Sequence, residues 1–195
     1  MGSWCDLRVA GHSVASMKSL VDPDVMTLFG KDDRRVWLVF PNANYFISGE
    51  EWKFRNSDTA MATAPANMID IARRNLHPLK DRLTFLEDAA ETVPGVQAIA
   101  TFGHTPGHIA LAITSKGERL LHVSDAALHP LQLEHPEWTP AFDLLAEQAS
   151  TSKLRIFGLA AEEDTLVFAH HFPPFPDLGH IHDQEQGWHW QPIDI

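Results

Sequence analysis

The sequence predicts an α/β fold with α+β layers, formed by a single domain over residues 1–195. Short apolar segments bounded by Pro, Gly, Asn and Asp recur through the middle of the chain, a pattern typical of strands. Two longer segments carry apolar residues at helical spacing. With 195 residues, 44% of them hydrophobic and 21% charged, the chain has the size and composition of one globular domain.

The predicted elements follow in order, starting after the first 35 residues, which show no sustained period and receive no assignment. Glu50 to Arg55 forms a helical turn, and a helix over 60–76 begins firmly after Pro65. A second helix over about 144–162 is expected to break or kink near Gly158. Strands are expected at 36–40, 44–48 and 165–169, in a four-strand meander at 83–86, 95–101, 109–114 and 120–124, and in a pair over 179–190 that turns near 186–187.

Charge and cysteine content exclude several classes of function. Fifteen Lys and Arg against 26 Asp and Glu give a net charge of −11, so neither nucleic acid nor a membrane surface is an expected partner. Cys5 is the only cysteine, which excludes an intramolecular disulfide, and without a neighbouring His or a helix-start signal it is expected to be an unreactive thiol. No signal peptide or membrane span is recognisable, so a cytoplasmic location is expected.

Three potential metal ligands stand where predicted strands end. His104 follows the strand at 95–101, Asp125 follows the strand at 120–124, and His171 follows the strand at 165–169. Imidazole and carboxylate groups are the ligands that zinc, iron and manganese accept in proteins. Simpler roles stay open: a turn histidine bonded to a backbone carbonyl, an Asx turn at Asp125, and a rigid loop around His171.

Two further patterns have simpler explanations than a functional site. His180 and His182 lie on one face of a predicted strand and could bind a metal at the surface, but a solvated strand with an aromatic edge is the expected role. Gly103 and Gly107 do not form a phosphate loop, because no Lys-Ser/Thr follows them and no helix opens there.

The residues around these ligands resemble a known family. The segments 101–108 (TFGHTPGH), 123–125 (VSD) and 171–180 (HFPPFPDLGH) are similar to the last three motifs of the metallo-β-lactamase superfamily. The segments 40–45 (FPNANY), 50–52 (EEW), 135–138 (HPEW) and 142–143 (FD) are similar to its lactonase-like and organophosphate-hydrolase-like members. The resemblance covers about residues 36–190. It implies a partial αββα sandwich, mostly its C-terminal half.

This resemblance also implies roles for individual residues. His104 would be the third histidine of one metal site, His171 the last histidine of the other, and Asp125 the bridging, catalytic carboxylate. His108 would support these ligands without binding metal. The implied cofactor is zinc, iron or manganese, and the implied reaction is hydrolysis of a small lactone, ester, β-lactam or organophosphate by metal-activated water.

The sequence departs from the family pattern in one motif. It contains no His-x-His-x-Asp-His, and the nearest alignment offers only His12, so four expected ligands are missing and metal is expected to be substoichiometric or absent. His170, His122 or His129 could substitute, but their spacing selects none of them. The competing interpretation is a non-catalytic truncated homologue or interaction remnant. Missing upstream strands would leave an apolar sheet face exposed and favour a homodimer.

Overall fold

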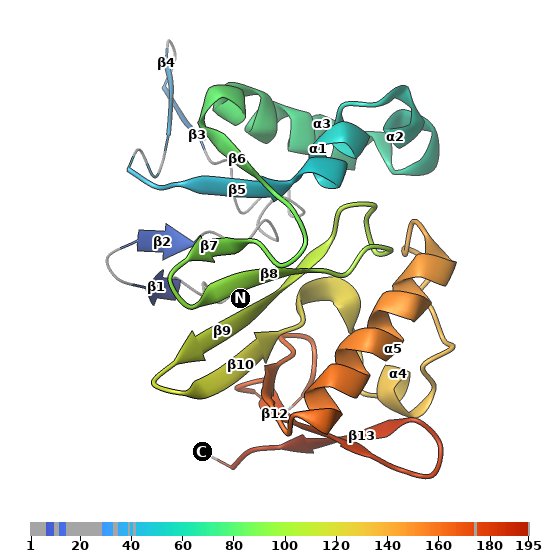
Figure 1. The fold of residues 1–195 in the computed structure, drawn as a ribbon. Coiled ribbons are helices and arrows are strands. Elements are labelled where there is room, and N and C mark those ends of the chain that lie inside the picture. The colour runs from blue at the N-terminus through green and yellow to red at the C-terminus, as the bar shows by residue number, and fades with distance from the viewer. Residues whose placement is uncertain are drawn as a thin grey trace. The chain divides into compact units, whose positions relative to one another are not determined.

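The computed structural model describes residues 7–9, 12–14, 29–32, 35–38, 40, 42–173 and 175–194, the residues before 40 by their backbone alone. Cys5 lies outside the described residues. The chain divides into two compact units, Met1–Ile47 with Trp52–Phe85 and Ser48–Glu51 with Leu86–Ile195. Figure 1 shows the elements and labels most of them. No helix among the described residues is long and apolar enough to cross a membrane.

The first unit combines strand pairs with a helical segment. Its strands pair two by two: β1 (Leu7–Val9) with β2 (His12–Val14), β3 (Phe29–Asp32) with β4 (Arg35–Leu38), and β5 (Tyr45–Ser48) with β6 (Leu83–Leu86). The helices are α1 (Gly49–Arg55), whose first three residues belong to the second unit, α2 (Asp58–Thr63) and α3 (Ala66–Leu76), followed by a 3-10 segment at His77–Arg82. Ala72 and Leu76 pack against Ile47, so the apolar face of α3 covers β5.

The segment predicted as one helix over 60–76 is two helices. Ser57 caps α2 by accepting a hydrogen bond from the backbone N–H of Ala60 at 3.2 Å. Pro65 stands at the N-cap of α3 and marks its start, as the sequence predicts. Proline disfavours helical backbone in the residue before it, and Ala64 is extended, which separates the two helices.

The second unit is built on a seven-stranded sheet. The strand order is β13-β12-β11-β10-β9-β8-β7, and every neighbouring pair is antiparallel except β10 and β11. The strands are β7 (Glu91–Val93), β8 (Val96–Ala100), β9 (Ile109–Ser115), β10 (Glu118–His122), β11 (Leu166–Phe168), β12 (Leu178–Asp183) and β13 (Trp188–Pro192). The parallel pair requires a crossover, which contains α4 (Leu131–Glu134) and α5 (Ala146–Glu162). This mixed architecture confirms the predicted α/β class.

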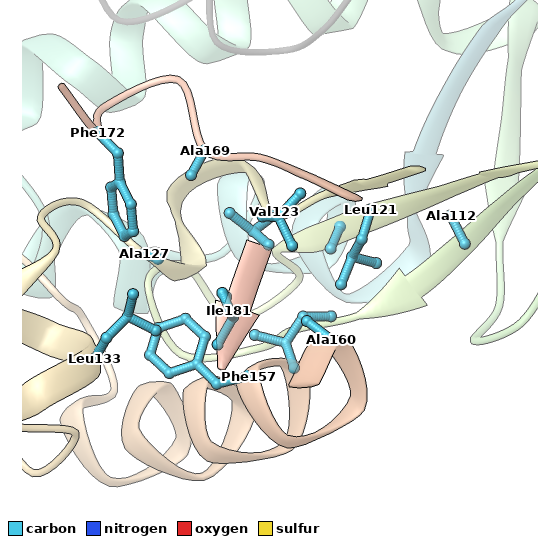
Figure 2. Close-up of a cluster of buried hydrophobic side chains, with 13 residues drawn as sticks. Ala112, Leu121, Val123, Ala127, Leu133, Phe157, Ala160, Ala169, Phe172 and Ile181 are labelled. Carbon is cyan, nitrogen blue, oxygen red and sulfur yellow. The ribbon is translucent and has the colours of Figure 1, made fainter. Parts of the chain in front are cut away.

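The core of this unit lies between the sheet and α5. Phe157 and Ala160 of α5 are directed toward Ile181 of β12, with Leu133 of α4 beside Phe157 (Figure 2). All four side chains are 1% exposed or less. Removing this apolar surface from water stabilises the sheet that carries the candidate ligands.

Two predictions about these elements are wrong. The strand at 83–86 pairs with β5 and not with the meander, whose fourth strand is β7. The turn at Pro94-Gly95 joins β7 to β8, and Gly95 has the positive φ of 82° that such a turn requires. The helix α5 also runs through Gly158 without the predicted break, because its buried face outweighs the low helix propensity of one glycine.

The topology brings three loops to one edge of the sheet. Since β8 and β10 are both antiparallel to β9, and β10 is parallel to β11, these three strands run in the same direction. The loops that follow them, at 101–108, 123–126 and 169–177, therefore start at the same edge. The three predicted ligands, His104, Asp125 and His171, lie in these loops.

Candidate metal site

Asp125 is surrounded by histidines from the two other loops. Its Oδ1 lies 3.1 Å from Nε2 of His171 and 3.4 Å from Nε2 of His170, while its Oδ2 lies 3.9 Å from Nε2 of His104. The Asp125 side chain is only 17% exposed. The two carboxylate oxygens therefore face different imidazole groups.

His104 is oriented by a buried carboxylate. Its Nδ1 lies 2.9 Å from Oδ1 of Asp143, whose side chain is 5% exposed. Because a carboxylate only accepts, this contact keeps the proton of His104 on Nδ1 and leaves the lone pair of Nε2 directed toward Asp125. Metal-binding histidines in proteins are commonly oriented in this way.

His170 has polar atoms without hydrogen-bond partners. Both ring nitrogens are buried, and neither has a hydrogen-bond partner among the described residues. The 3.4 Å approach of Nε2 to Asp125 is a charge contact that lacks hydrogen-bond geometry. The ring is held by aromatic contacts with His171, His122 and Phe168, at centroid distances of 4.3, 5.6 and 6.2 Å.

The loop that carries His104 is fixed from two sides. Ser48 Oγ donates to the carbonyl oxygen of Gly107 at 2.6 Å, and the Gly107 N–H donates to the buried Glu51 at 3.1 Å. On the other side, Ser152 of α5 donates to the carbonyl oxygen of Phe102 at 2.6 Å. These bonds hold the loop backbone, and with it the position of His104.

The donor set at Asp125 fits a transition-metal ion. Imidazole nitrogens and carboxylate oxygens bind zinc, iron and manganese, and the unpartnered nitrogens of His170 are buried atoms that such an ion would satisfy. Asp125, His170 and His171 each offer a ligand atom within 4.8 Å of the other two. The structure thus brings together all three predicted ligands and adds His170.

Sequence reasoning assigned no role to Asp143, Glu51 or Ser48. Asp143 acts across 39 residues and Glu51 across 56, distances at which no local pattern reveals a contact. The Phe-Asp pair at 142–143 contributes to the family resemblance and was the available signal for Asp143. Glu51 and Ser48 carry no comparable signal beyond the EEW segment at 50–52.

The remaining histidine pattern lies on β12 and β13. The rings of His180 and His182 are stacked with centroids 6.0 Å apart, and His189 of β13 lies 5.3 Å from His182. Nδ1 of His180 lies 3.1 Å from the exposed Asp164. Among the described residues, the ligand atoms of these histidines do not form a group as close as the one at Asp125.

Comparisons with known proteins identify the fold. Hydrolase AbOPH of the β-lactamase superfamily superimposes with a TM-score of 0.71 and 26% identity, over 80% of this chain and 57% of that one. AidC, a dizinc quorum-quenching lactonase, gives a TM-score of 0.73 and 26% identity, over 82% and 57%. The described chain therefore has the metallo-β-lactamase fold, as the motifs predict.

The sequence is similar to a lactonase. An N-acyl homoserine lactonase from Bacillus sp. is 35% identical over 103 residues, which are 52% of this chain and 37% of that protein. No protein-family model matches. The chain thus spans less than two thirds of the length of each of these relatives.

Proposed function

We propose that the chain is a metal-dependent hydrolase that hydrolyses a small lactone or ester, with β-lactams and organophosphates as alternative substrates. The observation that carries this proposal is the convergence of three histidines on the carboxylate of Asp125. The similarity to N-acyl homoserine lactonase and to AidC supports the lactone as substrate class. His104, Asp125 and His171 are the proposed metal ligands.

A zinc, iron or manganese ion held there would supply Lewis acidity toward a carbonyl oxygen and lower the pKa of water. The residues of the chain supply orientation and proton transfer. Asp143 holds the proton of His104 on Nδ1, so that Nε2 stays available as a ligand. Asp125 carries the carboxylate that accepts a proton from the attacking water and returns it to the departing alcohol.

An exposed aromatic residue supports an apolar substrate. Phe142 is 62% exposed, and its ring lies edge-on to His104 with centroids 6.1 Å apart. A large apolar side chain in water beside the proposed ligands is suited to contact an acyl chain. We propose that Phe142 contributes this contact.

The decisive experiment combines metal loading with a matched pair of variants. The metal-free chain is supplied with zinc, manganese or ferrous iron, and ring opening of an N-acyl homoserine lactone is followed by proton release. We expect turnover that Asp125→Asn abolishes and Asp183→Asn, which alters an exposed carboxylate at the end of β12, preserves.

The non-catalytic alternative has its own supporting observation, the absence of His-x-His-x-Asp-His from the sequence. It predicts that no lactone, ester, β-lactam or organophosphate is hydrolysed above the buffer rate with any of these metals. An Asp125→Asn variant with the same turnover as the parent chain would also contradict the proposed site.

A further inference from the structure

We infer that His170 is a metal ligand, and that with Asp125 and His171 it forms a mononuclear site of two histidines and one carboxylate. The inference rests on the proposed function and refines its ligand set: His170 replaces His104 as the third ligand, and the site holds one ion. It concerns a ligand that the motif resemblance does not include. The sequence lacks the His-x-His-x-Asp-His motif, and His170 supplies a third protein ligand for one ion.

The interatomic distances suit a shared ion. In a tetrahedral zinc site with bonds of about 2.0–2.1 Å, two ligand atoms lie roughly 3.3 Å apart. Nε2 of His170 and Nε2 of His171 lie 3.4 and 3.1 Å from the same oxygen of Asp125. His104 approaches the other oxygen at 3.9 Å, so it stands outside this group of three.

The surroundings of His170 point to the same role. Its ring nitrogens are buried and lack hydrogen-bond partners among the described residues, which is costly unless another ligand satisfies them. Aromatic contacts with His122 and Phe168 hold the ring in place at the end of β11. A ring fixed by packing, with an unused nitrogen 3.4 Å from a carboxylate, is preorganised for a metal.

The other two substitutes that the sequence leaves open are placed differently. Nδ1 of His129 accepts a hydrogen bond from the backbone N–H of Leu131 at 3.2 Å, at the start of α4. The ring of His122 stacks on Phe168 with centroids 5.0 Å apart. Neither histidine belongs to the group of close ligand atoms found among the described residues.

The ligand count changes the expected metal content. Two protein ligands per ion predict substoichiometric metal, whereas three are the usual number at a catalytic zinc ion. A site of two histidines and one carboxylate also accepts ferrous iron and leaves positions open for water and substrate. We therefore expect one tightly bound ion for each chain.

The test measures Co²⁺ and Zn²⁺ binding to the metal-free chain, with the visible absorption of bound Co²⁺ as a readout independent of turnover. His170→Phe keeps the aromatic packing and removes the ligand. His122→Phe is the matched control, because it changes the neighbouring ring of the same stack. We expect one Co²⁺ per chain, a loss of affinity of about 100-fold or more in His170→Phe, and little change in His122→Phe.

The outcomes separate this inference from the proposed function. Equal Co²⁺ affinity and spectrum in His170→Phe, or a loss confined to His122→Phe, would overturn the inference and leave hydrolysis intact as a proposal. One ion that depends on His170, without lactone turnover, would support the inference and contradict the function. Circular dichroism of the metal-free variants checks that they fold. If His170→Phe does not fold, the same Co²⁺ measurement is made on His170→Gln. Absence of any bound ion overturns both.

Discussion

Nε2 of His108 accepts a hydrogen bond of 3.1 Å from the backbone N–H of Asp125. On the opposite side of the ring, Nδ1–H donates to the carbonyl oxygen of Thr101 at 3.1 Å. An acceptor at one nitrogen and a donor at the other define the neutral imidazole. His108 thus ties the loop of His104 to the loop of Asp125 and is committed to hydrogen bonds, which agrees with a supporting role.

The neutral state of His108 predicts that acid weakens the fold. Burial lowers the pKa of His108 from 6.5 to about 4, against the opposing attraction of Asp125. Between about pH 4 and pH 6.5 the unfolded chain therefore binds more protons than the folded chain. The contribution of His108 to the free energy of unfolding is complete above pH 6.5 and is lost as the pH falls toward 4. We expect the free energy of unfolding in urea, measured with chelator, to fall by about 2 kcal/mol from this group between pH 7 and pH 5.

His108→Gln provides the comparison for this measurement. Other titrating groups contribute equally to both proteins, so the difference between their pH profiles isolates His108. The variant should lose about 2 kcal/mol of the pH dependence. If the free energy of unfolding depends on pH equally in the two proteins, His108 is not held neutral by the fold.

Asp143→Asn distinguishes the ligand set that includes His104 from the set that contains His170 in its place, because Asp143 orients His104. Asp143→Asn keeps the shape of the side chain and removes the charge that holds the proton on Nδ1 of His104. If His104 contributes to metal binding, the affinity should fall by about 10–100-fold, as measured by competition with a chelating dye. The matched control is Asp164→Asn, which alters a carboxylate–histidine pair with His180 away from Asp125. Equal affinities in the two variants would remove His104 from the metal site.

Strands with clear boundaries could be predicted from the sequence, and so could the positions of the candidate ligands that follow them. The segments at 109–114 and 120–124 are apolar and bounded by turn residues, and they correspond to β9 and β10. Their pairing partners were harder to predict, because pairing depends on packing between distant segments. The segment at 83–86 looks like its neighbours in sequence, yet it pairs with β5.

The site shows the same division between local and distant information. Motifs identify His104, Asp125 and His171 because each lies in a recognisable local pattern. Selecting His170 over His122 and His129 needs the register of β10 and β11, which places His122 opposite Phe168 and directs the residues beyond both strands to the same edge. Asp143 likewise gains its role from the path of the chain between α4 and α5.

Phe142 is expected to affect substrate binding more than chemistry, if the chain is a lactonase. Phe142→Ala removes an exposed ring beside His104 and leaves the hydrogen bond of Asp143 in place. KM for a long-chain N-acyl homoserine lactone should rise about tenfold or less, with kcat nearly unchanged and a smaller effect for a short-chain substrate. Trp138→Ala, which removes an exposed ring stacked on His135, serves as the control. A chain-length preference that Phe142→Ala leaves unchanged would exclude this contact.

Gly107 and Gly158 should respond in opposite directions to alanine. A Cβ at Gly107 would lie 2.0 Å from the backbone N of Glu51 and 2.3 Å from Oγ of Ser48, so Gly107→Ala must displace the groups that hold this loop. We expect a loss of about 3 kcal/mol in the free energy of unfolding, together with weaker metal binding.

A Cβ at Gly158 would meet nothing nearer than a Trp188 ring carbon at 4.0 Å, and helix propensity then favours alanine by about 0.5–1 kcal/mol. Urea unfolding of both variants beside the parent chain measures these changes. A Gly107→Ala protein as stable as the parent would show that this loop is not packed against Ser48 and Glu51. A destabilised Gly158→Ala would show that the helix does not accommodate a methyl group at this position.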